Sequence, residues 1–205
     1  MSDLLLATAN PGKQREFSRL LRGLPGRLIM PQDLGLDLDV PEPHVTYAEN
    51  AAAKASAYCF ASGLPALADD SGLEVAALDW GPGARSARHG GSVVEDRAAL
   101  ILEMLDGATD RRARMVCWLA LALPGVAPDG TPRAPRVELF SGEMDGAIAN
   151  ERRGSGGFGY DPIFLLPSGA TTAELPEGEK DAISHRGRAV AAAMPRLREL
   201  AGVQA

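Results

Sequence analysis

The amino-acid sequence predicts a mixed α/β fold with long antiparallel strands and flanking helices, arranged as two lobes around a central cleft. Short apolar runs alternate with segments of helical periodicity through the first 105 residues, which is typical of α/β proteins. Two long strand-like segments, residues 114–123 and 136–148, follow each other across a loop that contains Pro and Gly, as in an antiparallel pair. The length of 205 residues suits a single domain over residues 1–205.

The first half of the chain is expected to contain three short strands and two helices. The strands are predicted at the apolar runs 3–8, 28–30 and 66–68. One helix begins near Lys13 and ends before Gly23. The second runs from Thr46 to Ser62, because Thr46 is a good N-cap and Glu49 stands in the capping-box position. Residues 31–45 are rich in Pro and acids without a period, so they favour a loop.

The second half is expected to hold a glycine-rich loop, a helix, the two long strands, a short strand and a final helix. In order, these segments are residues 81–92, 95–105, 114–123, 136–148, 163–165 and 182–200. The last helix is rich in Ala, and interruptions are predicted in it at Gly187 and Pro195.

Composition and charge exclude several classes of partner. The chain is 45% hydrophobic and 23% charged, with a net charge of -6. An acidic molecule is a poor partner for a nucleic-acid polymer, and no apolar run approaches the length of a membrane span. Cys59 and Cys117 lie in apolar segments, which indicates buried free thiols in a reducing cytoplasm. The N-terminus lacks a basic region before its apolar run, so no signal peptide is expected.

The loop over residues 154–162 is the most informative segment. Four glycines in six positions let its backbone approach a ligand closely, and Phe158, Tyr160 and Asp161 add two rings and a carboxylate. Such a loop suits a pocket for a base that bears phosphates, which makes the central cleft a nucleotide cleft. The alternative is a glycine-rich hairpin loop. The match to a dinucleotide fingerprint is rejected, because Pro162 follows where a helix should begin.

The segment Thr8-Ala9-Asn10-Pro11-Gly12-Lys13 joins a strand to a helix through a tight turn. This arrangement presents backbone N–H groups and the positive helix dipole to an anion, and Lys13 adds a charge. It is not a Walker A loop, since Ala7 and Gln14 replace required residues. An ordinary strand–turn–helix junction remains the alternative.

Asp69 and Asp70 end the predicted strand at 66–68 and precede Ser71 and Gly72. Adjacent side chains on a strand point to opposite sides, so only one carboxylate faces a cleft, and Asp69 is expected to point away. Mg²⁺ commonly takes one or two protein carboxylates together with phosphate oxygens. Glu42 is a candidate second ligand. A turn capped by Asp, with a solvated Glu42, is the competing interpretation.

Further cations and polar groups stand near these motifs. Asn50 and Lys54 are one helical turn apart and share a face. Lys180, His185 and Arg186 lie near the last helix. The three histidines have no spacing typical of a zinc site.

Together these segments resemble the inosine triphosphate pyrophosphatase family, the house-cleaning hydrolases of nonstandard purine nucleoside triphosphates. The matching pieces are residues 8–13, 49–51 with Lys54, 67–73, 82–83 with 86–88, 156–162 and 182–187. They follow the family's order and cover nearly the whole chain. His89 follows Ser86-Ala87-Arg88 where the family usually has Tyr.

The resemblance implies Mg²⁺-dependent cleavage of inosine- and xanthosine-type triphosphates, ribo or deoxyribo, to the monophosphate and pyrophosphate, in a cytoplasmic homodimer. Asp70 matches the carboxylate that accepts a proton and binds Mg²⁺, and Glu42 matches a second Mg²⁺ position. The residues matched to substrate contacts are Thr8, Ala9, Asn10, Pro11, Gly12, Lys13, Lys54, Ser71, Phe158, Gly159, Tyr160, Asp161, Lys180, His185 and Arg186. Two other functions remain open: a pyrophosphatase for modified pyrimidine nucleotides, and a catalytically silent nucleotide-binding module.

Overall fold

The structure is a computed structural model that describes residues 3–42, 44–84, 96–127 and 129–202. The chain divides into two compact units. Unit 1 comprises Met1–Asp70, Cys117–Gly142 and Ala189–Ala205, and unit 2 comprises Ser71–Val116 and Glu143–Arg188. The two-part organisation and the mixed α/β class agree with the sequence prediction.

The described residues form five α-helices and one mixed sheet. The helices are α1 (Pro11–Leu20), α2 (Tyr47–Ser62), α3 (Arg97–Met104), α4 (Glu177–Ile183) and α5 (His185–Leu200). The strands are β1 (Leu4–Leu6), β2 (Leu28–Ile29), β3 (Ala66–Val75), β4 (Gly81–Pro82), β5 (Arg112–Val126), β6 (Pro132–Ile148) and β7 (Phe164–Leu165). Their order is β2-β1-β3-β5-β6-β7, and β4 pairs with β3.

Strand directions follow from the connections. β1 is parallel to both β2 and β3, and each of these pairs is linked through a helix, as parallel strands require. β5 and β6 are neighbours joined only by residues 127–131, too short for a crossover, so they are antiparallel as predicted.

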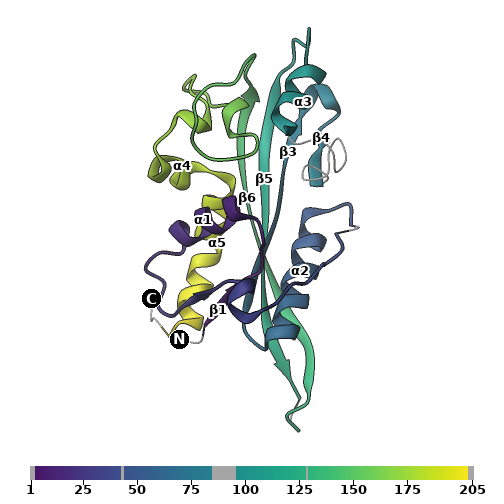
Figure 1. The fold of residues 1–205 in the computed structure, drawn as a ribbon, viewed down its shortest axis with the longest axis vertical. Coiled ribbons are helices and arrows are strands. Elements are labelled where there is room, and N and C mark those ends of the chain that lie inside the picture. The colour runs from purple at the N-terminus through teal and green to yellow at the C-terminus, as the bar shows by residue number, and fades with distance from the viewer. Residues whose placement is uncertain (1–2, 43, 85–95, 128, 203–205) are drawn as a thin grey trace. The chain divides into compact units, whose positions relative to one another are not determined.

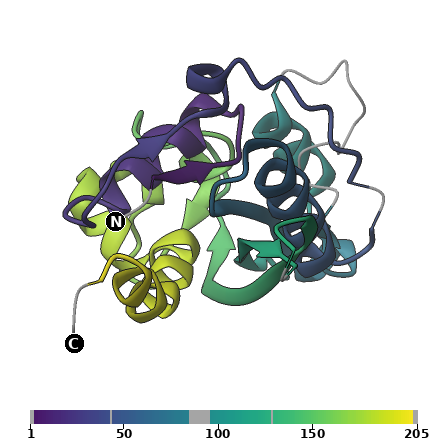
Figure 2. The same ribbon diagram turned by 90° about the horizontal axis from the view of Figure 1, so that it is seen from below.

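In unit 1 the period of two along the strands sorts the side chains between two helical layers. Leu4, Leu6 and Leu67 pack in one apolar cluster with residues of α1 and α5. Leu5 and Ala68 belong to another cluster, with residues of α2. Figure 1 and Figure 2 accordingly show α1 and α5 on one side of the unit 1 strands and α2 on the other. Because β1 and the first part of β3 carry apolar residues on both faces, this part of the sheet is buried between helices.

Unit 2 has one apolar cluster of its own. Leu73 of β3, Ile101 of α3, Met115 of β5, Ile148 of β6 and Phe164 of β7 all belong to it. The amphipathic pattern predicted at 95–105 therefore buries the apolar face of α3 against strands.

Side chains cap the N-termini of α1 and α2. α2 begins after Thr46 as predicted, whereas α1 begins at Pro11 rather than near Lys13. The Asn10 side chain accepts a hydrogen bond from the Lys13 backbone N–H at the start of α1. The Thr46 hydroxyl accepts from the Glu49 N–H at the start of α2. α2 ends at Gly63, whose left-handed backbone suits a C-cap glycine.

Four sequence predictions of local structure are wrong in detail. β3 does not end before Asp69 but continues to Val75, because β1 and β4 pair with its two ends. Residues 31–34 form a 3-10 helix inside the predicted loop. Gly81 and Pro82 form β4 within the predicted glycine-rich loop.

The fourth error concerns the C-terminal helix, which is broken at Ser184 rather than at Gly187 or Pro195. Ser184 has an extended backbone, and its hydroxyl accepts from the Gly187 N–H, so it starts α5 as an N-cap. Gly187 lies inside α5, where a Cβ atom would overlap the Asp181 carbonyl oxygen. Its lack of a side chain permits close packing of the two helices.

Candidate functional site

The loop before α1 is held in place by its own polar side chains. The Thr8 hydroxyl accepts from the Asn10 N–H at 3.2 Å, and Asn10 caps the helix. The Gln14 side-chain amide donates to the Thr8 carbonyl at 2.9 Å. These bonds fix the turn from β1 into α1, and therefore the place from which Lys13 extends.

Two lysines and two carboxylates of unit 1 form adjoining ion pairs. Lys13 Nζ lies 2.9 Å from Asp69 Oδ2, and Lys54 pairs with Glu42. Lys54 Nζ also donates to the Asp69 carbonyl at 3.1 Å. The side chains of Lys13 and Lys54 are 15% and 16% exposed. The predicted cations, Lys13 and Lys54, thus both contact β3 at Asp69.

Asp70 is buried beside the same groups and is contacted from α2. Asn50 Nδ2 donates to Asp70 Oδ2 at 3.0 Å. Asn50 also binds the His44 backbone at both its N–H and its carbonyl. Asn50 therefore links Asp70 to the segment that follows Glu42.

Burial disfavours the charged form of Asp70, whereas its polar and cationic neighbours favour it. Burial raises the pKa of the Asp70 carboxyl above its ordinary value; the Asn50 hydrogen bond and the two lysines oppose that rise, and the charge of Glu42 adds to it. Burial alone would lower the pKa of Lys54, but Asp69, Glu42 and Asp70 outweigh burial and raise it. Asp70 is therefore a stronger proton acceptor than an exposed aspartate.

The alternation of β3 explains why two adjacent aspartates meet different partners. Asp69 follows the side of Leu67, toward α1 and Lys13, whereas Asp70 follows Ala68, toward α2 and Asn50. The expected opposite orientations are confirmed. The expectation that Asp69 points away from functional groups is wrong, because it binds Lys13.

This cluster suits a divalent cation in its chemistry. Its three carboxylates, Glu42, Asp69 and Asp70, outnumber its two lysines. A cation would offset the cost of burying the Asp70 charge, which is the main cause of its raised pKa, and the smaller repulsion from Glu42. Among the described residues no group of three or more His, Cys, Asp or Glu could by itself hold a metal ion. A site with two protein carboxylates completed by substrate oxygens and water is the kind that Mg²⁺ accepts.

In unit 2, Asp161 is the centre of a second polar cluster. Asp161 Oδ2 accepts from Lys180 Nζ at 2.7 Å and from the Phe158 N–H at 2.6 Å. The Lys180 and Asp161 side chains are only 5% and 4% exposed. This buried ion pair joins the loop over residues 154–162 to α4.

Two cations lie over the Phe158 ring. The Lys180 ammonium is 5.6 Å from the ring centroid, and the Arg186 guanidinium carbon is 5.1 Å from it. Arg186 also donates to the Ser71 hydroxyl at 2.7 Å. The structure thus brings together five predicted residues of this unit: Phe158, Asp161, Lys180, Arg186 and Ser71.

The remaining predicted residues occupy varied positions. Ala9 and Pro11 are exposed, Gly12 is buried in α1, and Gly159 is an exposed residue with a left-handed backbone. His185 is buried at the start of α5. Tyr160 packs against the unit 2 apolar cluster. Ser86-Ala87-Arg88 and His89 lie outside the described residues.

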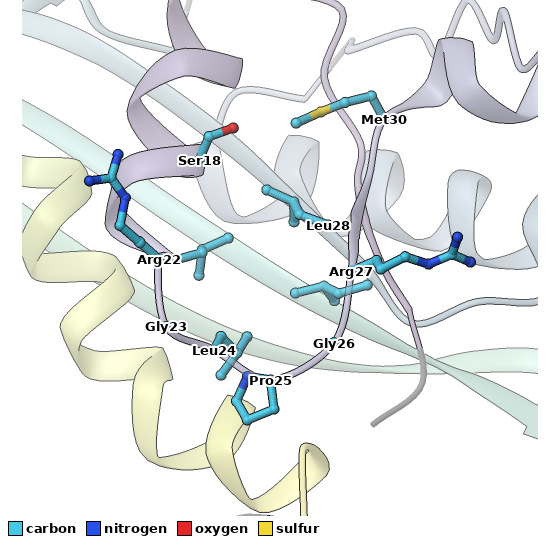
Figure 3. A pocket seen from close by; sticks show the side chains of 11 residues that line it. Ser18, Arg22, Gly23, Leu24, Pro25, Gly26, Arg27, Leu28 and Met30 are labelled. Atoms are coloured by element: carbon cyan, nitrogen blue, oxygen red, sulfur yellow. The ribbon is translucent and has the colours of Figure 1, made fainter.

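A pocket of about 280 Å³ in unit 1 is separate from these clusters (Figure 3). It lies between the C-terminal part of α1 and β2, and it contains none of the predicted site residues. Its lining residues include Leu4, Leu21, Leu24, Leu28, Met30, Arg22 and Arg27. In Figure 3 the head groups of Arg22 and Arg27 point away from the other labelled side chains.

Sequence reasoning missed three residues of these clusters as site components. The sequence places Asn50 on the same helical face as Lys54 but indicates no partner for it, and it predicts that Asp69 points away. Thr172 was not singled out, although its buried hydroxyl donates to Asp161 Oδ1 at 2.9 Å. No sequence pattern marks Thr172, because this contact depends on how the chain folds back.

The fold is mixed α/β, with a lysine–carboxylate cluster in unit 1 and an aromatic ring contacted by two cations in unit 2. Comparison with known proteins identifies the family. The model of the Ham1 family matches residues 4–196. The chain is 45% identical over 196 residues to a "dITP/XTP pyrophosphatase" of Geobacter sulfurreducens, covering 93% of this chain and 94% of that protein. It is 48% identical over 192 residues to one of Deinococcus deserti, covering 92% and 86%.

Solved structures give the same result. A HAM1 protein from Coxiella burnetii matches with a TM-score of 0.77 and 41% identity, covering 99% of this chain and 98% of that one. The Staphylococcus aureus Ham1 protein matches with a TM-score of 0.79 and 35% identity, covering 98% and 100%. This chain belongs to the Ham1 family, which confirms the resemblance seen in the sequence.

Proposed function

We propose that this protein hydrolyses nonstandard purine nucleoside triphosphates, of the inosine and xanthosine type, to the nucleoside monophosphate and pyrophosphate. The observation that carries the proposal is the unit 1 cluster, in which buried Asp70 lies with Lys13, Lys54 and Glu42 beside the loop that begins α1. Relatives that share 40–48% of its residues are named dITP/XTP pyrophosphatases, which supports the same substrate class here.

The loop at Thr8–Lys13 would bind the triphosphate. Backbone N–H groups at the start of α1 and the Lys13 ammonium would neutralise phosphate charge. In the ligand-free structure Lys13 is paired with Asp69 and Lys54 with Glu42. Substrate binding would therefore exchange carboxylate partners for phosphate oxygens, at low cost in new desolvation because these groups are already largely buried.

Asp70 and Glu42 would hold Mg²⁺. When bound, the cation would supply charge neutralisation at the phosphate oxygens and polarise the phosphoanhydride. Moving Glu42 onto the metal would release Lys54 from its ion pair and make its ammonium available to the substrate.

Asp70 would also accept the proton of the water that attacks the α-phosphorus. A general base works best when its pKa approaches the working pH, and burial shifts the pKa of Asp70 in that direction. The Asn50 hydrogen bond holds one carboxylate oxygen, which fixes the orientation of the other. The leaving group is pyrophosphate, whose charge the lysines would offset.

The unit 2 cluster would bind the base. Phe158 would stack on it, and Lys180 and Arg186, both within 6 Å of the Phe158 ring, are donors suited to the 6-keto oxygen of hypoxanthine or xanthine. Adenine carries an amino donor at that position and would leave such groups unpaired. Ala9, Gly159, Tyr160, Asp161 and His185 would complete the substrate contacts.

Two wider properties belong to the proposal. The resemblance supports a homodimer, and the free, buried state of Cys59 and Cys117 supports a reducing compartment, the cytoplasm. Within the described part of the chain, no helix has the length and apolar character to cross a membrane.

Pyrophosphate release over a panel of purine and pyrimidine triphosphates, with and without Mg²⁺, tests the proposal. ITP and XTP should be cleaved in the presence of Mg²⁺ and ATP poorly. Preference for modified pyrimidine nucleotides would assign the protein to the other pyrophosphatase class. Binding without turnover of any nucleotide would identify a silent binding module.

A further inference from the structure

The carboxylate of Asp161 is held by donors from three separate segments. Lys180 of α4 and the Phe158 N–H of the loop over residues 154–162 both donate to Oδ2, at 2.7 and 2.6 Å. The Thr172 hydroxyl donates to Oδ1 at 2.9 Å and lies 3.1 Å from the Asp161 carbonyl. Since Oδ2 accepts from Lys180, which lies over the Phe158 ring, and from the backbone that carries that ring, the orientation of the carboxylate decides where both groups lie.

Contacts that do not involve Asp161 hold the turn that carries Thr172. It is fully buried and opens a short 3-10 helix, Thr172–Glu174. The preceding residue fixes that helix: the Thr171 N–H donates to Glu174 at 2.6 Å, and its hydroxyl donates to the Arg153 carbonyl at 2.8 Å. Thr172 therefore offers its hydroxyl to Asp161 from a preformed turn.

On its other side, the Asp161 carboxylate packs closely against the backbone of Gly157, which has no side chain. A Cβ atom at Gly157 would overlap Asp161 Oδ2, although Gly157 itself is exposed. The carboxylate is thus bounded by the Thr172 hydroxyl at one oxygen and by the bare Gly157 backbone at the other. Asp161 could form an ion pair with Lys180 without either contact. Both contacts restrict the orientation of the Asp161 carboxylate in that pair.

We propose that Thr172 is a positioning residue for base selectivity, acting through Asp161 on Lys180 and on the Phe158 backbone. The inference rests on the proposed function and deepens it. With the hydroxyl removed, Asp161 Oδ1 loses its donor and the carboxylate is free to rotate. The Lys180 ammonium then follows its partner and no longer meets a 6-keto oxygen in a fixed direction. Phosphate binding by unit 1 residues is unaffected.

Thr172→Val tests the inference, because Val keeps the shape and removes the hydroxyl. The kcat/KM for ITP should fall by about tenfold or more, the range expected for a buried polar atom left unpaired. That for ATP should fall much less, so the ITP/ATP ratio narrows. The loss should appear mainly in KM, since base contacts are made equally in the ground state and the transition state. IMP binding, measured by calorimetry, should weaken by the same factor. Thr172→Ser retains the hydroxyl and should keep the ITP/ATP ratio of kcat/KM and the affinity for IMP at their wild-type values.

Thr171→Val is the matched control. Thr171 is a neighbouring, equally buried threonine that also donates a hydrogen bond, but to Arg153 rather than to Asp161. It should lower the melting temperature and leave the ITP/ATP ratio unchanged, because the backbone N–H of residue 171, which Val retains, still donates to Glu174 and holds the 3-10 helix in place. A purely structural role for Thr172 predicts that both Val variants behave alike, and that result would overturn the inference.

Gly157→Ala perturbs the same carboxylate from an exposed loop and supplies the answer if Thr172→Val does not fold. It should also narrow the ITP/ATP ratio and weaken IMP binding. A wild-type ratio in either folded variant refutes the positioning role. Wild-type enzyme in the same assay separates the two claims: no pyrophosphate from ITP would refute the proposed function, while IMP binding would still test the role of Thr172.

Discussion

Replacement of Asp70 by Asn separates two consequences of burying this carboxylate. The side chain keeps its shape, and its amide oxygen can still accept from Asn50 Nδ2, now 3.0 Å from Oδ2. The negative charge and the ability to accept a proton are lost. Turnover should therefore fall by roughly 10²–10⁴-fold, the range for a positioned acid–base group, in a protein that remains folded.

The same substitution should stabilise the metal-free protein at neutral pH. Burial raises the pKa of Asp70 in the folded state above its unfolded value of 3.8, so ionisation disfavours folding. By linkage that penalty is fully present above the folded pKa and disappears below pH 3.8. The melting temperature of Asp70→Asn should exceed that of the wild type at pH 7 with a chelator, and the difference should shrink as the pH falls through the raised pKa.

Asp69→Asn is the control, because the adjacent carboxylate differs in its partner. Asp69 is buried at 1% exposure and paired with Lys13 at 2.9 Å. Loss of this charge-assisted bond costs about 1.5–3 kcal/mol, and should lower the melting temperature by about 3–12 °C at this chain length. The reasoning fails if Asp70→Asn retains near-native turnover, or if it destabilises the metal-free protein as much as Asp69→Asn does.

Four further substitutions test the other groups. Lys13→Ala should lower triphosphate affinity and turnover together while IMP binding, measured by calorimetry, barely changes; equal losses for both ligands would remove Lys13 from the phosphate site. Glu42→Gln should raise the Mg²⁺ concentration for half-maximal rate in a metal titration, and an unchanged titration would argue against a metal role. Phe158→Ala should cost ITP and ATP alike about 1–3 kcal/mol of binding, whereas Arg186→Ala should narrow the kcat/KM ratio between them; the opposite pattern would reverse the assigned roles.

Local patterns predicted the elements whose determinants lie close together in the sequence. The N-cap of α2, and the shared face of Asn50 and Lys54, follow from spacings of three and four residues. The continuation of β3 through Ser71 and Gly72 did not follow, because turn-forming residues can be overruled by pairing with strands distant in sequence, here β1 and β4.

The same distinction between local and long-range determinants applies to the candidate site. Residue types and their order indicated Lys13, Asp70, Phe158 and Lys180, but not which groups pair in the folded chain. The Lys13–Asp69 and Lys180–Asp161 ion pairs join residues 56 and 19 positions apart and depend on tertiary packing. Thr172 is the clearest case, since a threonine in a loop is common and only the fold brings its hydroxyl to Asp161.

Hydrolysis of an equimolar mixture of ITP and ATP in oxygen-18 water, with Mg²⁺ present, tests the central claim most directly. Mass spectrometry of the products reads base choice and the bond that breaks in one experiment. The account predicts that IMP and pyrophosphate accumulate while ATP persists, and that the solvent oxygen is found in the phosphate of IMP, because water attacks the α-phosphorus. Release of AMP at the same rate as IMP, oxygen-18 in pyrophosphate, or production of orthophosphate and IDP would contradict it.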